Sequence, residues 1–178
     1  MKTFIRAMAI NLVFILLCGI IYPLGMMGLS QLFFPKQANG SIIEYKERPV
    51  GSELLGQSFT SQKFFRGRVQ GPSNLAPSNP ALVERVTSDM DVFLAAHPGV
   101  RREEIPTDLM TGSASGLDPH ISKEAALVQV SAVAKATGIS PVELELLIEK
   151  NTEGRTFGIF GAERVNVLKL NLDIAAKI

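Results

Sequence analysis

The chain has 178 residues, with 18 basic and 17 acidic side chains, and its single cysteine lies in a long apolar run near the N-terminus. Without Lys2 and Arg6, which precede that run, 16 basic and 17 acidic residues remain, a formal charge of −1. This near-neutral remainder argues against binding to nucleic acid or to acidic lipid through a basic patch, and the cysteine and histidine content gives no disulfide and no structural zinc site.

Residues 7–35 predict a transmembrane helix. They include no Asp, Glu, Lys, Arg or His, and only ~20 helical residues are needed to cross a hydrocarbon core about 30 Å thick. A cleaved signal peptide is the alternative, but its apolar core is about 7–15 residues long and is followed by small residues at the cleavage site. Phe33-Phe34-Pro35-Lys36 offers no such site, so we expect the span to be retained.

The charges flanking the span indicate its orientation. Lys2 and Arg6 precede it, and Lys36, Lys46 and Arg48 follow it closely, so the positive-inside count is nearly tied. A short cationic tail before a first span usually stays in the cytoplasm. We therefore expect residues 1–6 in the cytoplasm and a single pass through the cell membrane, with the C-terminal domain outside.

Small and polar residues recur along the predicted span. Asn11, Cys18 and Gly25 are seven residues apart, and Gly28 lies one turn beyond Gly25. On a helix these positions form one stripe, where small residues let another helix approach and an Asn can hydrogen-bond across the contact. Pro23 removes a backbone N–H and predicts a kink. The stripe predicts an interface with other membrane helices; a featureless anchor is the alternative.

Beyond the span, residues 36–50 are predicted as a linker and residues 51–178 as one extracytoplasmic domain. Its expected class is α+β (mixed α/β), with a small sheet and about three helices. Short β-compatible stretches are expected at residues 42–45, 52–59, 64–68 and 164–173. Along residues 164–173 successive side chains would alternate between two faces of a strand. Asn166, Leu168, Leu170 and Leu172 share one face and Val165 and Val167 the other, which predicts a strand that is central at its start.

Capping signals predict three helices in the domain. The first begins with Asn79 as N-cap and Pro80 at its first position and ends at residues 97–99. Its inward face is expected to be Val83, Val86, Met90, Phe93 and Leu94. The second runs from the N-cap Ser122 through Thr137, ended by Gly138. The third opens with the capping box at residues 140–143 and turns inward Leu144, Leu147 and Ile148.

Residues 105–121 form a long polar loop that carries the one candidate for catalysis. Its hydrolase-like residues are Ser113, Ser115, Asp118 and His120. The G-x-S-x-G elbow fails here, because the central position of Gly112 to Gly116 is Ala114. A serine hydrolase remains an alternative function, since geometry and not inventory defines a triad. The sequence contains no phosphate-binding G-x-x-x-x-G-K-[ST] or G-x-G-x-x-G motif. It also contains no zinc-binding H-E-x-x-H motif.

Two further polar features have simple structural interpretations. Four arginines could lie beside three acidic residues, and exposed ion pairs are the simplest interpretation of such a set. Its members are Arg66, Arg68, Arg155 and Arg164 with Asp118, Glu153 and Glu163. Gln129 lies in the middle of an otherwise apolar and small-residue helix, where an exposed position is the simplest expectation.

Ordered motifs along nearly the whole chain resemble the KdpC family, a subunit of the Kdp potassium-transporting ATPase. They are Tyr22-Pro23, Phe34-Pro35, Gln37-Ala-Asn-Gly-Ser41, Gly51-Ser-Glu-Leu-Leu-Gly-Gln-Ser-Phe59, Phe65-Arg-Gly-Arg68, Ser73-Asn-Leu-Ala-Pro-Ser-Asn-Pro80, Asp108-Leu-Met-Thr-Gly-Ser-Ala-Ser-Gly-Leu-Asp-Pro-His-Ile-Ser122 and Val165-Asn-Val-Leu-Lys-Leu-Asn-Leu172. Two departures from the pattern are a shorter loop between Arg68 and Ser73 and the lack of a tryptophan before Phe34-Pro35.

The resemblance implies an accessory subunit and not an enzyme. Its implied partners are a channel-like potassium-conducting subunit, a P-type ATPase subunit, a small single-span peptide and the lipid bilayer. The family is also described as a catalytic chaperone that raises the affinity of the ATPase for ATP, with a glutamine at the nucleotide. The matching position here is Gln129, and the chain has no cofactor of its own. An anchored ion- or ligand-binding module is a further alternative.

Overall fold

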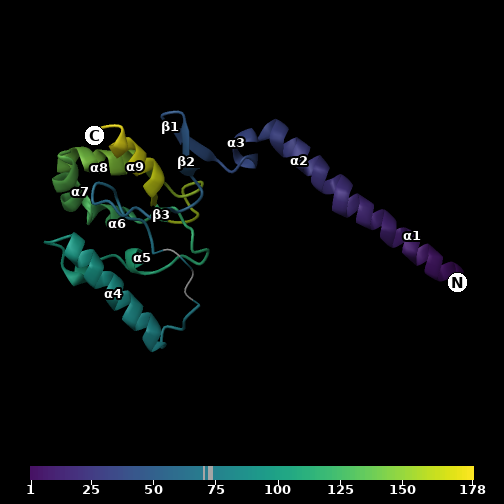
Figure 1. Ribbon diagram of the computed structural model, residues 1–178, viewed down its shortest axis with the longest axis horizontal. Coiled ribbons are helices and arrows are strands. Elements are labelled where there is room, and N and C mark those ends of the chain that lie inside the picture. Colours follow the sequence, from purple (N-terminus) through teal and green to yellow (C-terminus); the bar gives the residue numbers. More distant parts are fainter. Residues whose placement is uncertain (70, 72–73) are drawn as a thin grey trace. The chain divides into compact units, whose positions relative to one another are not determined.

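The computed structural model describes residues 1–69, 71 and 74–178 in two units, Met1–Ile42 and Ile43–Ile178. The first unit is a helix from Lys2 to Phe33, made of α1 (Lys2–Leu16), a π-helical turn (Leu17–Ile21) and α2 (Tyr22–Phe33), followed by the short α3 (Pro35–Ala38) (Figure 1). Its mean hydropathy reaches 2.4, and it is the one helix among the described residues that is long and apolar enough to cross a membrane. No side chain in α1 or α2 is buried.

The π-helical turn directly precedes Pro23. The N–H of Tyr22 donates to Leu17 O, five residues back, and Pro23, which has no N–H to donate, follows one residue later inside the continuous helix. The predicted kink itself stays a prediction.

The described residues of the second unit form two small antiparallel sheets. β1 (Ile42–Tyr45) and β2 (Arg48–Ser52) form a hairpin whose two turn residues, Lys46 and Glu47, both have positive φ. The other sheet has the order β3 (His120–Ile121), β5 (Arg164–Asn166), β4 (Thr152–Glu153). Ile121 and Thr152 both pair with Val165, so β5 is the central strand.

The helices of the second unit, α4 to α9 in Figure 1, together with this sheet give the mixed α/β class that the sequence predicts. In chain order they are α4 (Pro80–Ala96), a 3₁₀ turn (Arg102–Glu104), α5 (Thr107–Met110), α6 (Lys123–Leu127), α7 (Val130–Thr137), α8 (Pro141–Lys150) and α9 (Val167–Ala175). The fully buried core side chains between them include Phe65, Phe93, Leu109, Leu144, Ile148, Val165, Leu170 and Ile174.

The predicted N-caps are confirmed, although only the serine half of the capping box at residues 140–143 is present. The side chains of Asn79, Ser122 and Ser140 accept hydrogen bonds from backbone N–H groups two or three residues on, each at the start of its helix. Gly138 ends α7 with φ 79, a left-handed conformation that favours glycine. The inward residues predicted for α8 are buried. On α4, Phe93 is buried but Val83 is 58% exposed, so the expected inward face was too wide.

Two predicted strands do not form, and a third is shorter than predicted. Residues 164–173 form a strand only as far as Asn166, whose side chain then caps α9 by accepting from the N–H of Lys169. The alternating leucines also fit a helical period, and Leu170, Asn171 and Ile174 lie buried on one helical face. Residues 53–59 and 64–68 form no strand in the described structure.

The helix expected over residues 122–137 is divided in two. α6 ends at Leu127 and α7 begins at Val130, with Gln129 between them at φ −91 and ψ −12. The shortened loop expected between Arg68 and Ser73 includes residues 70, 72 and 73, which lie outside the described residues.

Candidate functional site

The predicted helix stripe lies on a fully exposed surface of the first unit. Asn11, Cys18, Gly25 and Gly28 are all exposed, and a Cβ added at Gly25 or Gly28 would meet no atom within 4 Å. Because a π turn has more residues per turn than an α-helix, it rotates the two glycines relative to Asn11 and Cys18. Its role as an interface stays a prediction.

Gln129 is fully buried in the second unit, so the exposed position expected from the sequence is wrong. Its Oε1 accepts from the N–H of Arg66 at 2.8 Å, and its Nε2 donates to Arg66 O at 3.1 Å and to Ala125 O at 2.8 Å. Both amide protons are thus used inside the protein. A buried polar side chain is stable when its groups are paired in this way.

Asn171 on α9 makes the same kind of hydrogen bonds with the backbone of Phe65, the residue before Arg66. Its Oδ1 accepts from the N–H of Phe65 at 2.8 Å, and its Nδ2 donates to Phe65 O at 2.9 Å. Together, Gln129 and Asn171 satisfy both polar backbone groups of two consecutive residues, as a neighbouring strand would. We call this pair the amide clamp. It explains why the β-compatible stretch at residues 64–68 joins no sheet.

A cleft of about 380 Å³ lies beside the clamp, lined in part by Phe59, Phe64, Arg66, Val92, His97 and Gln129. Its volume is in the range of small-molecule sites. The His97 ring stacks on Phe93 with centroids 4.0 Å apart, and its Nδ1 lies 2.9 Å from Phe93 O. Burial is the main cause that lowers the pKa of His97, and nearby Arg66 adds to the effect. The cleft thus offers apolar walls, a neutral imidazole and a guanidinium.

The hydrolase-like residues are brought together, but without the geometry of a triad. Ser113 Oγ accepts from the N–H of Asp118 at 3.2 Å and lies 3.2 Å from Ser115 Oγ. The ring nitrogens of His120 face two carboxylates, with Nδ1 3.1 Å from Asp118 Oδ1 and Nε2 3.6 Å from Glu153 Oε2. The imidazole is therefore engaged away from both serines, whereas a base must reach its nucleophile.

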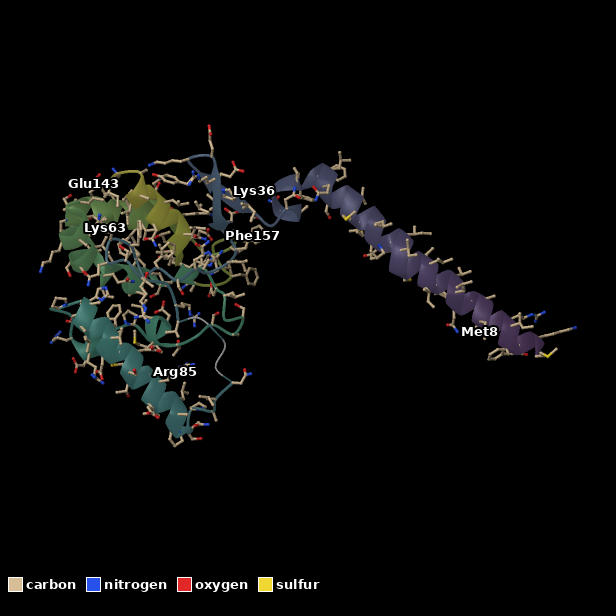
Figure 2. All side chains as sticks on the ribbon, viewed as in Figure 1. Met8, Lys36, Lys63, Arg85, Glu143 and Phe157 are labelled. Carbon is tan, nitrogen blue, oxygen red and sulfur yellow. The ribbon has the colours of Figure 1, made fainter. Side chains whose placement is uncertain are left out.

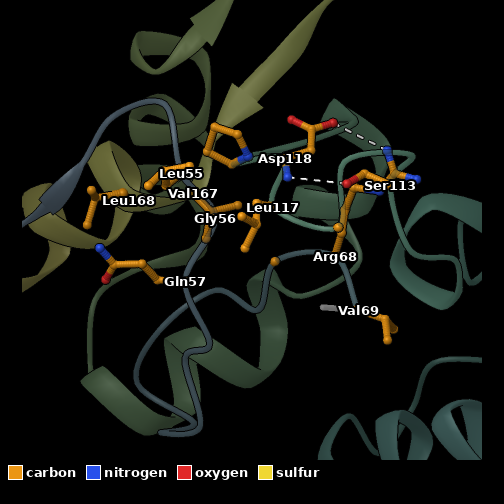
Figure 3. Close-up of a pocket in the computed structure, with 13 residues that line it drawn as sticks. Leu55, Gly56, Gln57, Arg68, Val69, Ser113, Leu117, Asp118, Val167 and Leu168 are labelled. Atoms are coloured by element: carbon orange, nitrogen blue, oxygen red, sulfur yellow. Dashed lines mark hydrogen bonds and ion pairs between the residues drawn. The ribbon is translucent and has the colours of Figure 1, made fainter. Parts of the chain in front are cut away.

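The space beside Ser113 is also too small for a substrate. Figure 3 shows Arg68 reaching Asp118, at 3.3 Å, beside a pocket of about 10 Å³, which is the space of a single water. Arg68 also donates to the carbonyls of Thr111 and Gly112. Gly56 packs so closely that a Cβ there would lie 2.7 Å from Asp118 O. These contacts tie the loop to the domain and leave no room for catalysis.

The arginine and acidic set forms in part. Arg68 pairs with Asp118 and Arg164 pairs with Glu153 at 3.0 Å, while Arg66 lines the cleft instead. Lys169, which the sequence did not single out, lies between Glu53 at 3.3 Å and Glu153 at 3.4 Å. It joins the end of β2 to the end of β4.

Two buried asparagines were also missed as site residues. Asn171 completes the clamp, and Asn166 donates to Glu53 O at 2.8 Å. Their signal is present in the sequence as two amides within the apolar run Val165–Leu172. Alternation placed Asn166 on a sheet face and left Asn171 without a role.

Comparison with known proteins covers both units. Residues 4–176 match the family model described as KdpC, K+-transporting ATPase, c chain. A potassium-transporting ATPase KdpC subunit of Clostridium kluyveri is 45% identical over 100% of this chain and 97% of its own length. The KdpC subunit of Caldanaerobacter subterraneus subsp. tengcongensis is 47% identical over 97% of this chain and 94% of its own length. The KdpC subunit of Clostridioides difficile is 43% identical over 98% of this chain and 97% of its own length.

Proposed function

The chain belongs to the KdpC family, the c chain of the K+-transporting ATPase, and on that premise we propose that it stabilises assembly of a high-affinity potassium importer. It is a non-catalytic accessory subunit of a potassium-transporting complex. The proposed partners are a channel-like potassium-conducting subunit, a P-type ATPase subunit and a small single-span peptide. The main support for this proposal is that the family match includes both the apolar helix and the domain, across residues 4–176.

The membrane helix is the proposed docking element. Its small residues at positions 18, 25 and 28 leave the backbone open to close approach, and Asn11 offers an amide for a hydrogen bond in lipid. A helix with no buried side chain of its own gains its packing from whatever surrounds it. We propose that this face packs on helices of the potassium-conducting subunit, with the N-terminus in the cytoplasm and the domain outside.

The domain is the proposed rigid part of the assembly. Its Ser113–His120 region is held by hydrogen bonds and ion pairs to Arg68, Glu153 and the surrounding backbone. Such a region suits a fixed protein-binding surface better than a hydrolytic site. This favours the accessory role over the serine-hydrolase alternative.

Substitution of one glycine tests the docking proposal. Gly25→Leu should reduce co-purification of the chain with its partner subunits severalfold, because the leucine side chain blocks close helix approach. Gly19→Leu is the matched control: it makes the same change at a glycine that is equally open but off the stripe. Equal recovery of the complex with both variants would contradict the proposed face.

A finer proposal concerns ATP. We propose that any effect of this chain on the ATP affinity of the complex depends on Gln129 through the position of residues 65–66 and the cleft beside them. Support comes from the three hydrogen bonds of the Gln129 amide, which leave neither of its protons for a nucleotide. Gln129→Leu should then shift the ATP concentration for half-maximal turnover together with domain stability. Asn171→Leu, on the other half of the clamp, should shift both in the same direction.

A further inference from the structure

An exposed apolar turn projects between β4 and β5. Phe157 is 89% exposed, Ile159 72% and Phe160 65%, within the uncharged residues 156–162. Isolated exposed apolar side chains are ordinary, but three within four consecutive residues form a patch that needs a partner. We call residues 156–161 the apolar turn; Figure 2 labels Phe157 on it.

Four backbone N–H groups of the apolar turn donate hydrogen bonds within the turn or to its base. Thr156 and Phe160 exchange both N–H to carbonyl bonds, at 2.8 and 3.0 Å, and the N–H of Gly158 donates to Arg155 O at 3.0 Å. The N–H of Ile159 donates to Thr156 O at 3.2 Å. Because lipid offers no partner to backbone groups, these bonds lower the cost of placing the turn at a membrane surface.

The conformation of the turn is preset. Phe157 has φ 54, a left-handed value that is uncommon outside glycine, and Gly158 and Gly161 continue with φ 74 and 84. The turn thus presents its apolar side chains without having to order itself on binding. The exposed Arg155 stands at its base, where a cation can meet lipid phosphate.

The turn is rooted close to where the domain joins the membrane anchor. Lys169 links Glu153, at the start of the β4–β5 connection, to Glu53, at the end of β2. β2 pairs with β1 in a hairpin, so its end lies beside Ile43, the first residue of the domain. In the sequence, only residues 34–42 separate Ile43 from the end of α2.

We propose that the apolar turn is a second membrane contact, inserting Phe157, Ile159 and Phe160 into the interfacial layer of the bilayer that the N-terminal helix crosses. Aromatic side chains favour the interfacial layer, and the exposed Arg155 beside them can meet lipid phosphate there. This contact goes beyond the proposed assembly role and needs no partner subunit. It would fix the orientation of the domain at the membrane surface.

The sequence provides a clean reporter, because the chain contains no tryptophan. The full chain carrying Phe157→Trp is reconstituted into vesicles of phosphatidylethanolamine and phosphatidylglycerol, with and without brominated acyl chains. Val142→Trp, at a position 67% exposed on α8, is the matched control. Brominated lipid should quench the Phe157→Trp chain at least about twofold more strongly than the control, and aqueous iodide should quench it less, as expected for an interfacial indole.

A second variant separates insertion from probe effects. Adding Ile159→Ser and Phe160→Ser to the Phe157→Trp chain should reduce lipid quenching to that of the control, with an unchanged unfolding midpoint, because both side chains are exposed. Equal lipid quenching of the Phe157→Trp and Val142→Trp chains would overturn the proposal. Protection from iodide that arises only when the other subunits are present would also overturn it, and would assign the turn to a protein partner. The lipid-quenching comparison uses vesicles that hold this chain alone, so its result does not depend on the assembly role.

Discussion

The helix of the first unit and the domain of the second obey opposite rules of burial. No side chain of α1 or α2 is buried, whereas the domain encloses a core that includes Phe65, Phe93 and Leu144 at 0% exposure. The domain therefore carries its stability within its own sequence. The helix depends on lipid and on other helices, and a change in it should be felt in assembly and not in the folding of the domain.

The largest test of this contrast is a cavity in the core. Phe65→Ala should lower the free energy of unfolding of the domain by about 3–5 kcal/mol, because it removes a fully buried aromatic ring. Urea unfolding of the full chain in detergent, followed by circular dichroism, measures this above the constant helical signal of the span. Phe157→Ala is the control, since its ring is 89% exposed and should change the midpoint little. A simultaneous loss of membrane insertion would break the contrast.

The amide clamp should give the next largest effect. Asn171→Leu leaves the N–H and carbonyl of Phe65 buried without partners, which should cost about 2–4 kcal/mol at one to two per group. Gln129→Leu should cost a similar amount through Arg66. The same denaturation experiment measures both. If either variant unfolds at the wild-type midpoint, the clamp is not a stabilising feature of the domain.

The smallest expected effect is a pH dependence confined to the domain. Burial lowers the pKa of His97 in the folded state, while the unfolded chain keeps the ordinary value of about 6.5. The unfolded state therefore binds the proton more readily, so this contribution is present above about pH 6.5 and is lost as the pH falls below it. His97→Gln should flatten the fall of the unfolding midpoint between neutral and mildly acidic pH. A slope equal to that of the unchanged chain would show that other groups cause it.

Local signals made much of this fold predictable. The caps Asn79, Ser122 and Ser140 and the left-handed Gly138 each depend on residues within one turn, and all four mark helix ends in the structure. The apolar run near the N-terminus needs only length and composition to be identified as a candidate span. The central position of β5 was predictable because apolar residues lie on both faces of the stretch around Val165.

The wrong predictions concern positions whose structure depends on residues far away in the sequence. Alternation over residues 164–173 suits both a strand and one face of a helix, and the helix forms once Asn166 caps it. Gln129 looked exposed because neighbours in the sequence say nothing about Arg66, 63 positions away. The candidate triad had the right inventory, but the partners that occupy His120 include Glu153 from another strand. Packing across the fold, and not local propensity, settles each of these.

The amide clamp also bears on the order in which the domain folds. It joins Phe65 to Asn171 across 106 positions of the chain, and Arg66 to Gln129 across 63. Closing loops of that length is entropically costly before the rest of the structure is in place. The segment around Phe65 should therefore dock late, onto helices that are already formed. Its amide protons should then exchange with solvent when this segment undocks from the formed helices, which makes Phe65 and Arg66 reporters of a partial opening of the domain.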